Sequence, residues 1–193
     1  MSNMNEIIKS SDIVTLADAQ SCGISKPSFY KYIKQYNFVK IGPGIYAAPD
    51  AWVDNLYVLH KRCPQGVISH DEAFYYHGLT DREPVQPTIT IYSGYNARRL
   101  TAAGYKVYMV KKELLELGKI SVEDNFGNVI PMYDLERTIC DLVRNRSAFE
   151  AQDFYAALKA YAARRVKDLN RLMRYAELFR VDKVVRQYLE VLL

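Results

Sequence analysis

The first part of the chain shows short helical patterns of apolar residues. Residues 4–10 place Ile7 and Ile8 together and predict one short helix. A second short helix is predicted at about 15–22, opened by a capping box of Thr15 and Asp18. Gly23 then suits a tight corner between two helices.

A third helix is predicted from about Lys26. Ser25 is placed to cap it, and Pro27 falls in its first turn, where a missing N–H costs little. Apolar residues at intervals of three and four are expected to pack inward, namely Phe29, Tyr32, Ile33 and Tyr36. The opposite face is polar and basic, with Lys26, Ser28, Tyr30, Lys31 and Lys34.

A two-stranded hairpin is predicted directly after this helix. Strands at about 38–41 and 45–48 flank the turn Gly42-Pro43-Gly44. Helices, a glycine corner, a basic helix and a glycine-rich hairpin, in this order, indicate a winged helix-turn-helix domain over residues 1–49. The same elements also serve as a plain packing module, so their order leaves that use open.

Residues 50–193 are expected to form a second, mixed domain. A helical pattern over 51–62 ends at Pro64, and Ser69 with Glu72 predicts a capping box for a helix through His77. Alternating apolar residues predict strands at 88–92, 106–110 and 120–123, and a hairpin that returns at 129–131. Helical patterns then follow at 134–145, 149–163, 167–179 and 181–192. The fold class expected is α+β: a winged helix, a small sheet and a helical tail.

The distribution of charge along the chain is more informative about function than the net charge. The net charge of +4 is mild, but residues 1–49 carry +2, residues 50–143 carry −3 and residues 144–187 carry +6. Between Asp18 and Asp50 there are four lysines and no acidic residue.

Such a local excess of positive charge favours binding to the phosphates of DNA. Winged helices place the outer helix in the major groove while the wing contacts the backbone. The expected partner is double-stranded DNA, contacted by Lys26, Ser28, Tyr30, Lys31, Lys34, Lys40 and Pro43. Tyr30 fits a second role equally well, as a support for the wing.

The helical tail contains a second basic pattern. Arg164, Lys167, Arg171 and Arg174 recur at intervals of three or four, and they form one stripe if the helix is continuous. The stripe would offer additional contacts to DNA or to an acidic partner; the alternative is an ordinary solvated face.

Length, hydropathy and cysteines narrow the class of protein. The 193 residues, 49% of them hydrophobic, suffice for two unequal domains. Apolar runs are shorter than the ~18 to 20 residues of a membrane-spanning helix, and the first residues lack a secretion signal, so a cytoplasmic protein without membrane contact is expected. The three cysteines, Cys22, Cys63 and Cys140, are expected to be buried free thiols.

Three segments together are similar to AbiEi, the antitoxin and transcriptional repressor family of bacterial AbiE abortive-infection systems. They are VTLADAQSCGISKPSFYKYIKQYNFVKIGPGIYAAP, ISHDEAFYYHGLTD and YDLERTICDLVRN, and the resemblance extends over essentially the whole chain. It implies a winged helix that binds inverted repeats in the protein's own promoter. It also implies a C-terminal antitoxin domain at 50–193 that neutralises a nucleotidyltransferase toxin, in the type IV manner, without a stable complex.

The YDLERTICDLVRN segment has a structural interpretation as well as a functional one. Leu135, Ile139 and Leu142 form a helical core stripe, and Glu136 and Arg137 are capping, ion-paired or functional residues. The structural role is the favoured of these.

The residues indicate no enzyme and no cofactor. His60, His70 and His77 lack the spacing of a zinc helix, no CxxC occurs, and phosphate-binding and hydrolase motifs are missing from the sequence. Glu123 and Asp124 suggest a metal-dependent nuclease only weakly. The main alternative to an antitoxin is a transcription regulator whose C-terminal domain binds a ligand or a partner.

Overall fold

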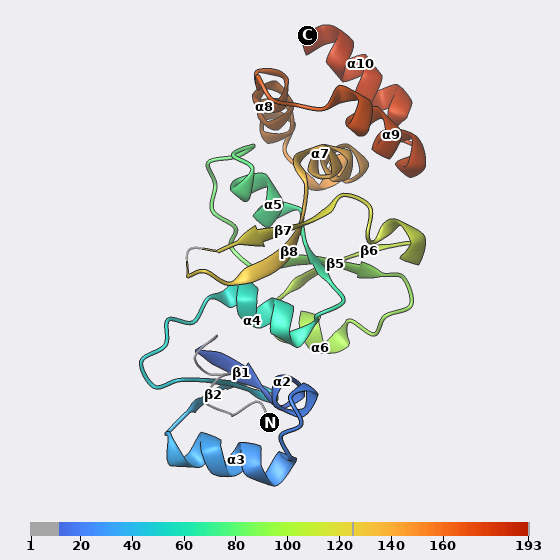
Figure 1. Ribbon diagram of the computed structural model, residues 1–193. Helices are drawn as coiled ribbons and strands as arrows, with labels where there is room; N and C mark the ends of the chain where they lie inside the picture. The colour runs from blue at the N-terminus through green and yellow to red at the C-terminus, as the bar shows by residue number, and fades with distance from the viewer. Residues whose placement is uncertain (1–11, 125, 193) are drawn as a thin grey trace. The chain divides into compact units, whose positions relative to one another are not determined.

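The computed structural model describes residues 12–124 and 126–192, so the helix expected at 4–10 lies outside the described part of the chain. The chain divides into two compact units. The first extends to Pro64 and also includes Glu123–Ile130; the second contains Gln65–Val122 and the chain from Pro131 onward. The expected domain limits, 1–49 and 50–193, stay predictions. The fold class is α+β, with two sheets and helices in both units (Figure 1).

The first unit combines a small antiparallel sheet with short helices. Its elements are β1 (Ile13–Thr15), α2 (Leu16–Ser21), α3 (Lys26–Gln35), β2 (Val39–Gly42), β3 (Ile45–Ala47) and α4 (Asn55–Arg62). β3 pairs with both β1 and β2, which gives the order β1-β3-β2. The hairpin of β2 and β3 was expected, whereas β1 was not. Three residues directly before a helix give too short a pattern to identify a strand.

The core of the first unit is formed by Val14, Ala19, Phe29 and Ile33. Phe29 and Ile33 are therefore inward, as expected, but Tyr32 is only half-buried and Tyr36 is exposed. Tyr36 is the C-cap of α3, where the helix no longer faces the sheet. Cys22 is exposed, contrary to expectation, because it lies in the corner between α2 and α3; Cys63 and Cys140 are buried free thiols.

The second unit is built on a mixed sheet. Its strands are β4 (Val67–Ile68), β5 (Thr88–Tyr92), β6 (Lys106–Val110), β7 (Lys119–Glu123) and β8 (Val129–Tyr133), in the order β6-β5-β4-β8-β7. β5 runs parallel to β6, and β4 is antiparallel to β5 and parallel to β8. The expected strands are confirmed. The sequence missed β4, the central strand, because only two residues of it pair.

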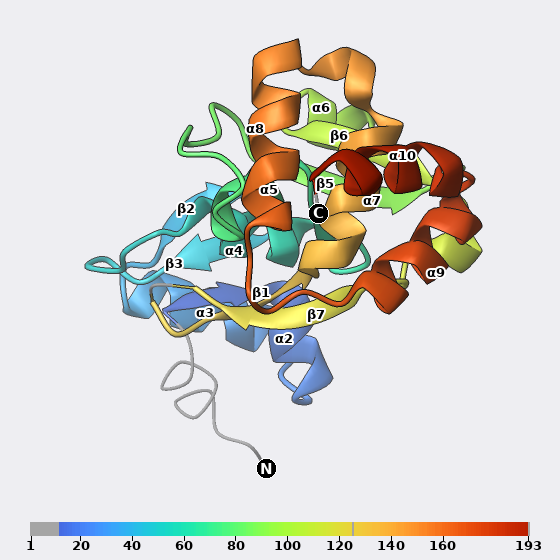
Figure 2. The same cartoon turned by 90° about the horizontal axis from the view of Figure 1, so that it is seen from above.

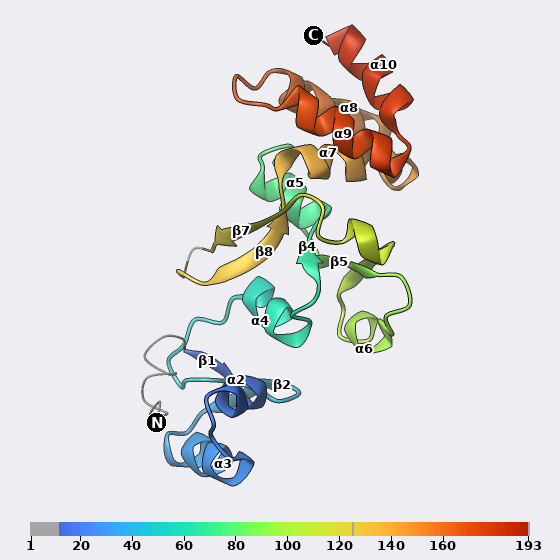
Figure 3. The same ribbon diagram turned by 45° about the vertical axis from the view of Figure 1, so that its right-hand side comes forward.

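Helices cover both sides of this sheet. They are α5 (Asp71–Tyr76), α6 (Arg98–Thr101), α7 (Leu135–Arg144), α8 (Ala151–Ala162), α9 (Leu169–Phe179) and α10 (Asp182–Leu192). Short 3₁₀ turns, η1 (Lys112–Leu114) and η2 (Arg146–Ala148), follow β6 and α7. α7 to α10 lie together on one side and α6 on the other (Figures 1 and 3), and α8 and α9 flank α7 (Figure 2). The main hydrophobic core lies among α5 and these four helices.

The junction of β4 and α5 corrects one expectation. His70, not Ser69, is the N-cap of α5, and its side chain does not cap the helix; Thr88 Oγ1 of β5 accepts a hydrogen bond from Glu72 N instead. The Ser69 hydroxyl is instead 2.8 Å from the Thr90 hydroxyl of β5, inside the sheet. Because its hydroxyl already has partners there, the capping box with Glu72 does not form.

Candidate nucleic-acid interface

α3 and the hairpin after it carry exposed basic residues of the first unit, and α3 is joined to α2 at a tight corner. Thr15 and Asp18 make the expected capping box at α2, with Asp18 N donating to Thr15 Oγ1 and Thr15 N donating to Asp18 Oδ2. Gly23 has φ of +77°, a conformation that glycine adopts without a steric penalty. Ser25 Oγ accepts a hydrogen bond from Ser28 N and caps α3. These local signals fix where α3 begins.

The expected DNA-binding residues lie on the outer surface of α3 and of the hairpin. Lys26, Ser28, Lys31, Lys34, Lys40 and Pro43 are exposed, and Tyr30 is 40% exposed. Among residues 12–124 and 126–192, no ion pair involves any of the four lysines. Their charges are therefore not neutralised by described carboxylates.

Tyr30 also contacts the hairpin. Its ring lies edge-to-face with Tyr46 of β3, with centroids 6.2 Å apart, and with Phe29, at 5.4 Å. Tyr46 also meets Phe29 edge-on. These three rings join α3 to β3. The contact between Tyr30 and Tyr46 supports the interpretation of Tyr30 as a support for the wing, and part of the Tyr30 ring is still exposed.

The position of α2 is fixed from the other side by α4. Lys61 Nζ lies 3.1 Å from Asp18 Oδ2 and 5.2 Å from the centre of the Tyr57 ring. Burial alone would lower the pKa of Lys61, but the Asp18 carboxylate and the Tyr57 hydroxyl together outweigh it and raise that pKa. Lys61 is therefore part of the framework, in contrast to the lysines of α3.

The basic residues expected in the tail do not share one helix. Arg164 and Lys167 lie between α8 and α9, so the continuous helix that the stripe required is not present. Lys167 Nζ donates to the carbonyl oxygens of Ala162 and Arg164 and closes the end of α8. Arg171 lies 3.4 to 4.0 Å from carboxylates of Asp168, Asp134 and Glu136. Arg174 is exposed.

The YDLERTICDLVRN segment contains the whole of α7 with both of its caps and is almost wholly buried. Asp134 caps α7 through Arg137 N, and Glu136 Oε1 accepts a hydrogen bond from Asp168 N. Arg137 donates through Nε to Asp141 and through Nη1 to the carbonyl oxygens of Leu114 and Leu117. These contacts tie α7 to the segment before β7 and support the structural interpretation of Arg137.

His70 is the centre of a buried polar cluster. Its ring stacks on Tyr108 at 3.4 Å, its Nδ1 is 3.0 Å from Ser69 Oγ, and its Nε2 is 3.0 Å from Asn145 Nδ2. Because an amide nitrogen only donates, Nε2 accepts and the ring is neutral with its proton on Nδ1. Burial, and then the charges of Arg137, Arg144 and Lys106, hold the pKa of His70 well below its usual value.

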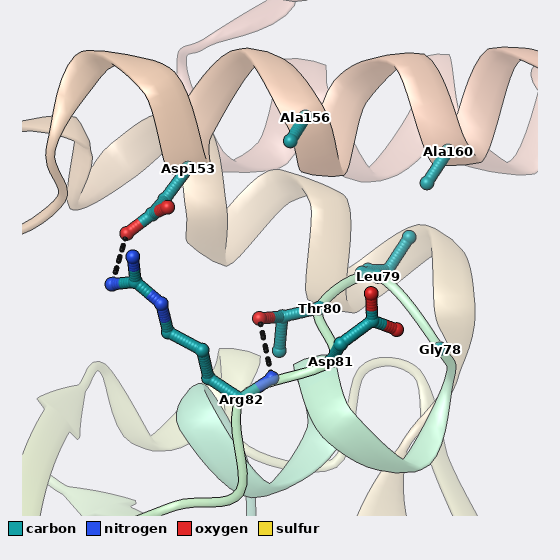
Figure 4. A pocket seen from close by; sticks show the side chains of 8 residues that line it. All are labelled: Gly78, Leu79, Thr80, Asp81, Arg82, Asp153, Ala156 and Ala160. Atoms are coloured by element: carbon teal, nitrogen blue, oxygen red, sulfur yellow. Dashed lines mark hydrogen bonds and ion pairs between the residues drawn. The ribbon is translucent and has the colours of Figure 1, made fainter.

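A shallow cavity of about 290 Å³ lies between the end of α5 and α8 (Figure 4). Ala156 and Ala160 of α8 and Leu79 form its apolar side. Arg82 reaches across one end to Asp153, at 2.8 Å, and Thr80 Oγ1 accepts a hydrogen bond from Arg82 N. The cavity has room for a small ligand; Arg82 is already paired with Asp153, and Asp81 adds a second acidic side chain to the lining.

The described residues hold neither a metal-binding cluster nor a helix suited to a membrane. Residues 12–124 and 126–192 contain no group of three histidine, cysteine or acidic side chains arranged to hold a metal ion. None of the helices there is both long enough and apolar enough to cross a membrane.

Comparison with known proteins gives a likeness in fold only. No family model and no curated protein matches the sequence. Among solved structures, the crystal structure of the RV2827C protein from Mycobacterium tuberculosis is similar, with a TM-score of 0.60 and 12% sequence identity. The match covers 96% of this chain and 78% of that one. At such an identity the likeness concerns the path of the backbone.

Proposed function

We propose that this chain binds double-stranded DNA through a winged helix made of α2, α3 and the β2–β3 hairpin. α3 has ten residues and is therefore about 15 Å long, enough to lie in a major groove of about 12 Å width. The hairpin would lie against the flanking phosphates, with Lys40 and Pro43 on its outer side.

The main support for this proposal is that four lysines of α3 and the hairpin are exposed and lack an ion-pair partner among the described residues. Lys26, Lys31, Lys34 and Lys40 are exposed, lie in a stretch without acidic residues, and pair with no carboxylate in the described part of the chain. A cation without an internal partner is available to replace a counterion at a phosphate.

The test is binding to a duplex from the region upstream of the protein's own gene. Replacing both Lys31 and Lys34 by Ala should weaken binding and lower the slope of log affinity against log salt by about 1.8, which is about 0.9 for each phosphate that is no longer neutralised. The matched control is Lys183→Ala with Arg186→Ala, which removes two exposed cations of α10. Unchanged affinity and slope in the α3 variant would exclude this interface.

We further propose that the protein is an autorepressing type IV antitoxin that acts in the cytoplasm on a nucleotidyltransferase toxin, without a stable complex. Support comes from the resemblance of the three sequence segments to AbiEi, which extends through the second unit. The proposal includes no enzymatic step. Co-expression with a nucleotidyltransferase encoded beside it should restore growth, and continued growth arrest would refute the antitoxin role.

A second candidate is a transcription regulator that responds to a small ligand, and the cavity between α5 and α8 favours it. The two candidates differ in what survives loss of DNA binding. The Lys31→Ala, Lys34→Ala variant should still protect cells if the chain is an antitoxin, whereas a regulator would lose its whole effect. A nuclease is tested by incubating DNA and RNA with the protein and magnesium or manganese, where intact nucleic acid discards it.

A further inference from the structure

A second stretch without acidic residues lies in the middle of the chain. Between Glu83 and Glu113 there are five basic residues and no aspartate or glutamate. This excess is hidden in the sum for residues 50–143, which is negative because acids gather on either side. The five cations are Arg98, Arg99, Lys106, Lys111 and Lys112.

Four of these cations lie on the two segments that leave one edge of the sheet in the second unit. β5 and β6 are parallel, so their carboxyl ends lie at the same edge. Ser93, just after β5, donates to the Val110 carbonyl oxygen at the end of β6 through its N–H, at 2.7 Å, and through its hydroxyl, at 3.1 Å. The chain then leads from Ser93 into α6 with Arg98 and Arg99, and from Val110 into Lys111 and Lys112.

These four side chains are available to a partner, and the fifth is not. Arg98, Arg99, Lys111 and Lys112 are exposed, and the ion pairs found in residues 12–124 and 126–192 include none of them. Lys106 Nζ, by contrast, lies 2.8 Å from Asp71 Oδ2. The contrast shows that the strand cation is neutralised inside the unit while the four at the edge face outward.

Two tyrosine rings lie among these cations. Tyr92 ends β5, and its ring meets that of Tyr95 edge-on with centroids 5.8 Å apart. Lys112 Nζ lies 6.0 Å from the centre of the Tyr92 ring. Both rings are half-buried, so each keeps part of its surface toward solvent. Cations beside aromatic rings combine the two contacts that a nucleotide offers, to its phosphate and to its base.

We propose that the edge formed by Tyr92, Tyr95, Arg98, Arg99, Lys111 and Lys112 binds single-stranded nucleic acid. Its guanidinium and ammonium groups contact phosphates, and the tyrosines stack with unpaired bases. A duplex fits this edge less well because its bases are already stacked. α6 has only four residues, about 6 Å of helix, and does not fill a major groove as α3 can.

This proposal does not rest on the proposed function of the first unit. α3 and the β2–β3 hairpin belong to the first unit, and all six residues of the edge belong to the second. The two surfaces can therefore be impaired separately, and the failure of one proposal leaves the other standing.

The test measures binding of the full-length chain by fluorescence anisotropy. The probes are a labelled single-stranded RNA of about 12 nucleotides, DNA of the same sequence, and an unrelated duplex of equal length. Binding is followed at salt concentrations between about 50 and 200 mM. The variants are Arg98→Ala with Arg99→Ala, Tyr95→Leu, the Lys183→Ala, Arg186→Ala control, and the Lys31→Ala, Lys34→Ala variant of α3. Thermal melting checks that each variant is folded.

The Arg98→Ala, Arg99→Ala variant should bind single strands at least about tenfold more weakly, with a salt slope lower by about 1.4, or about 0.7 for each phosphate. Tyr95→Leu should weaken binding at least about fivefold, because stacking of one base on an aromatic ring is worth about 1 kcal/mol or more. The α10 control and the α3 variant should bind single strands as the parent does. Tighter binding of RNA than DNA, or equal binding, both support the proposal, the first adding a contact to the 2′-hydroxyl.

Three results would overturn it. The first is unchanged binding of single strands by the arginine variant. The second is an equal loss in the α10 control, which would indicate a nonspecific charge effect. The third is a duplex that binds as tightly as the single strands and loses as much affinity in the arginine variant, which would make the edge a general polyanion surface.

Discussion

α3 and α7 have the same length of ten residues and use their charged side chains in opposite ways. α3 leaves Lys26, Lys31 and Lys34 exposed, and only Phe29 and Ile33 are buried. In α7 nearly every residue is buried, including Glu136, Arg137 and Asp141. One helix therefore presents its charge to the outside, and the other uses charge to hold its own unit together.

This difference shows that a charged residue in a helical pattern has to be interpreted by its burial and its partners. A buried charge is costly unless it is paired and hydrogen-bonded, so it persists only with internal partners. Arg137 illustrates this, since its guanidinium lies between the rings of Tyr133 and Phe179, 3.9 and 4.2 Å away, and donates to Asp141. An exposed cation without such partners contributes little to stability and is free to meet an external anion.

The largest expected effect comes from removing the buried ion pair between Arg137 and Asp141 of α7. Asp141→Ala should lower the free energy of unfolding by about 3 to 5 kcal/mol, because it leaves Arg137 buried without its carboxylate. Urea denaturation followed by circular dichroism measures this. The control is Arg82→Ala, which removes an arginine 73% exposed from its pair with Asp153 and should cost under about 1 kcal/mol. Equal losses would show that the α7 pair is no more important than a surface pair.

The next effect concerns protonation near α7. Since the pKa of His70 is lower in the folded chain than the usual value of 6.5, the unfolded chain binds the proton more readily. Stability should therefore fall as pH decreases through about 6.5, by at most about 1.4 kcal/mol per pH unit for this one proton. His70→Asn should flatten the dependence because asparagine has no titrating group, and asparagine tolerates the positive φ of this position. An identical pH profile in both proteins would contradict a neutral, buried His70.

A smaller effect is expected at the start of α2. Thr15→Ala removes the hydroxyl that accepts from Asp18 N and should cost about 0.5 to 2 kcal/mol. Thermal melting is a sufficient measurement. Ser21→Ala is the matched control, because its exposed hydroxyl contacts only the Asp18 carbonyl oxygen and Cys22 Sγ at the end of the same helix, and its melting temperature should stay close to that of the parent.

The smallest effect on stability is expected at the exposed lysines of α3. Lys31→Ala with Lys34→Ala should change the free energy of unfolding by less than about 0.5 kcal/mol, as is usual for surface positions. The same denaturation experiment decides it. A loss of more than about 2 kcal/mol would mean that these lysines support the fold, and weaker DNA binding in the variant could then be explained by unfolding alone.

The sequence predicted best what is decided by neighbouring residues. The starts of α2 and α3 follow from Thr15, Asp18 and Ser25, whose side chains bond within three residues. The sequence-based predictions were wrong or incomplete where contacts with distant segments determine the structure. Ser69 resembled a helix cap, but Thr90 of β5, 21 residues away, takes its hydroxyl. β4 depends on pairing with β5 and β8, and nothing within Val67–Ile68 signals this.

The candidate sites divide in the same way. The exposure of the α3 lysines could be predicted from helical spacing alone. The tail residues could not be interpreted so, because the helix ends between them, where Lys167 bonds to carbonyl oxygens at the end of α8, and because Arg171 pairs with the distant Asp134. The edge at Arg98 and Arg99 was missed because charge was summed over a long segment, and a shorter window of about 30 residues would have found it.

The turn between β7 and β8 has a consequence for how the protein is made and divided. Glu123–Ile130 belongs to the first unit although the strands on either side continue into the second. During synthesis, the first unit therefore stays incomplete until Ile130, a buried residue, has left the ribosome, by which point Gln65–Val122 of the second unit has also emerged. A fragment that begins at residue 65 would still contain Glu123–Ile130, which belongs to the first unit. Point substitutions therefore separate the activities of the two units more cleanly than truncations.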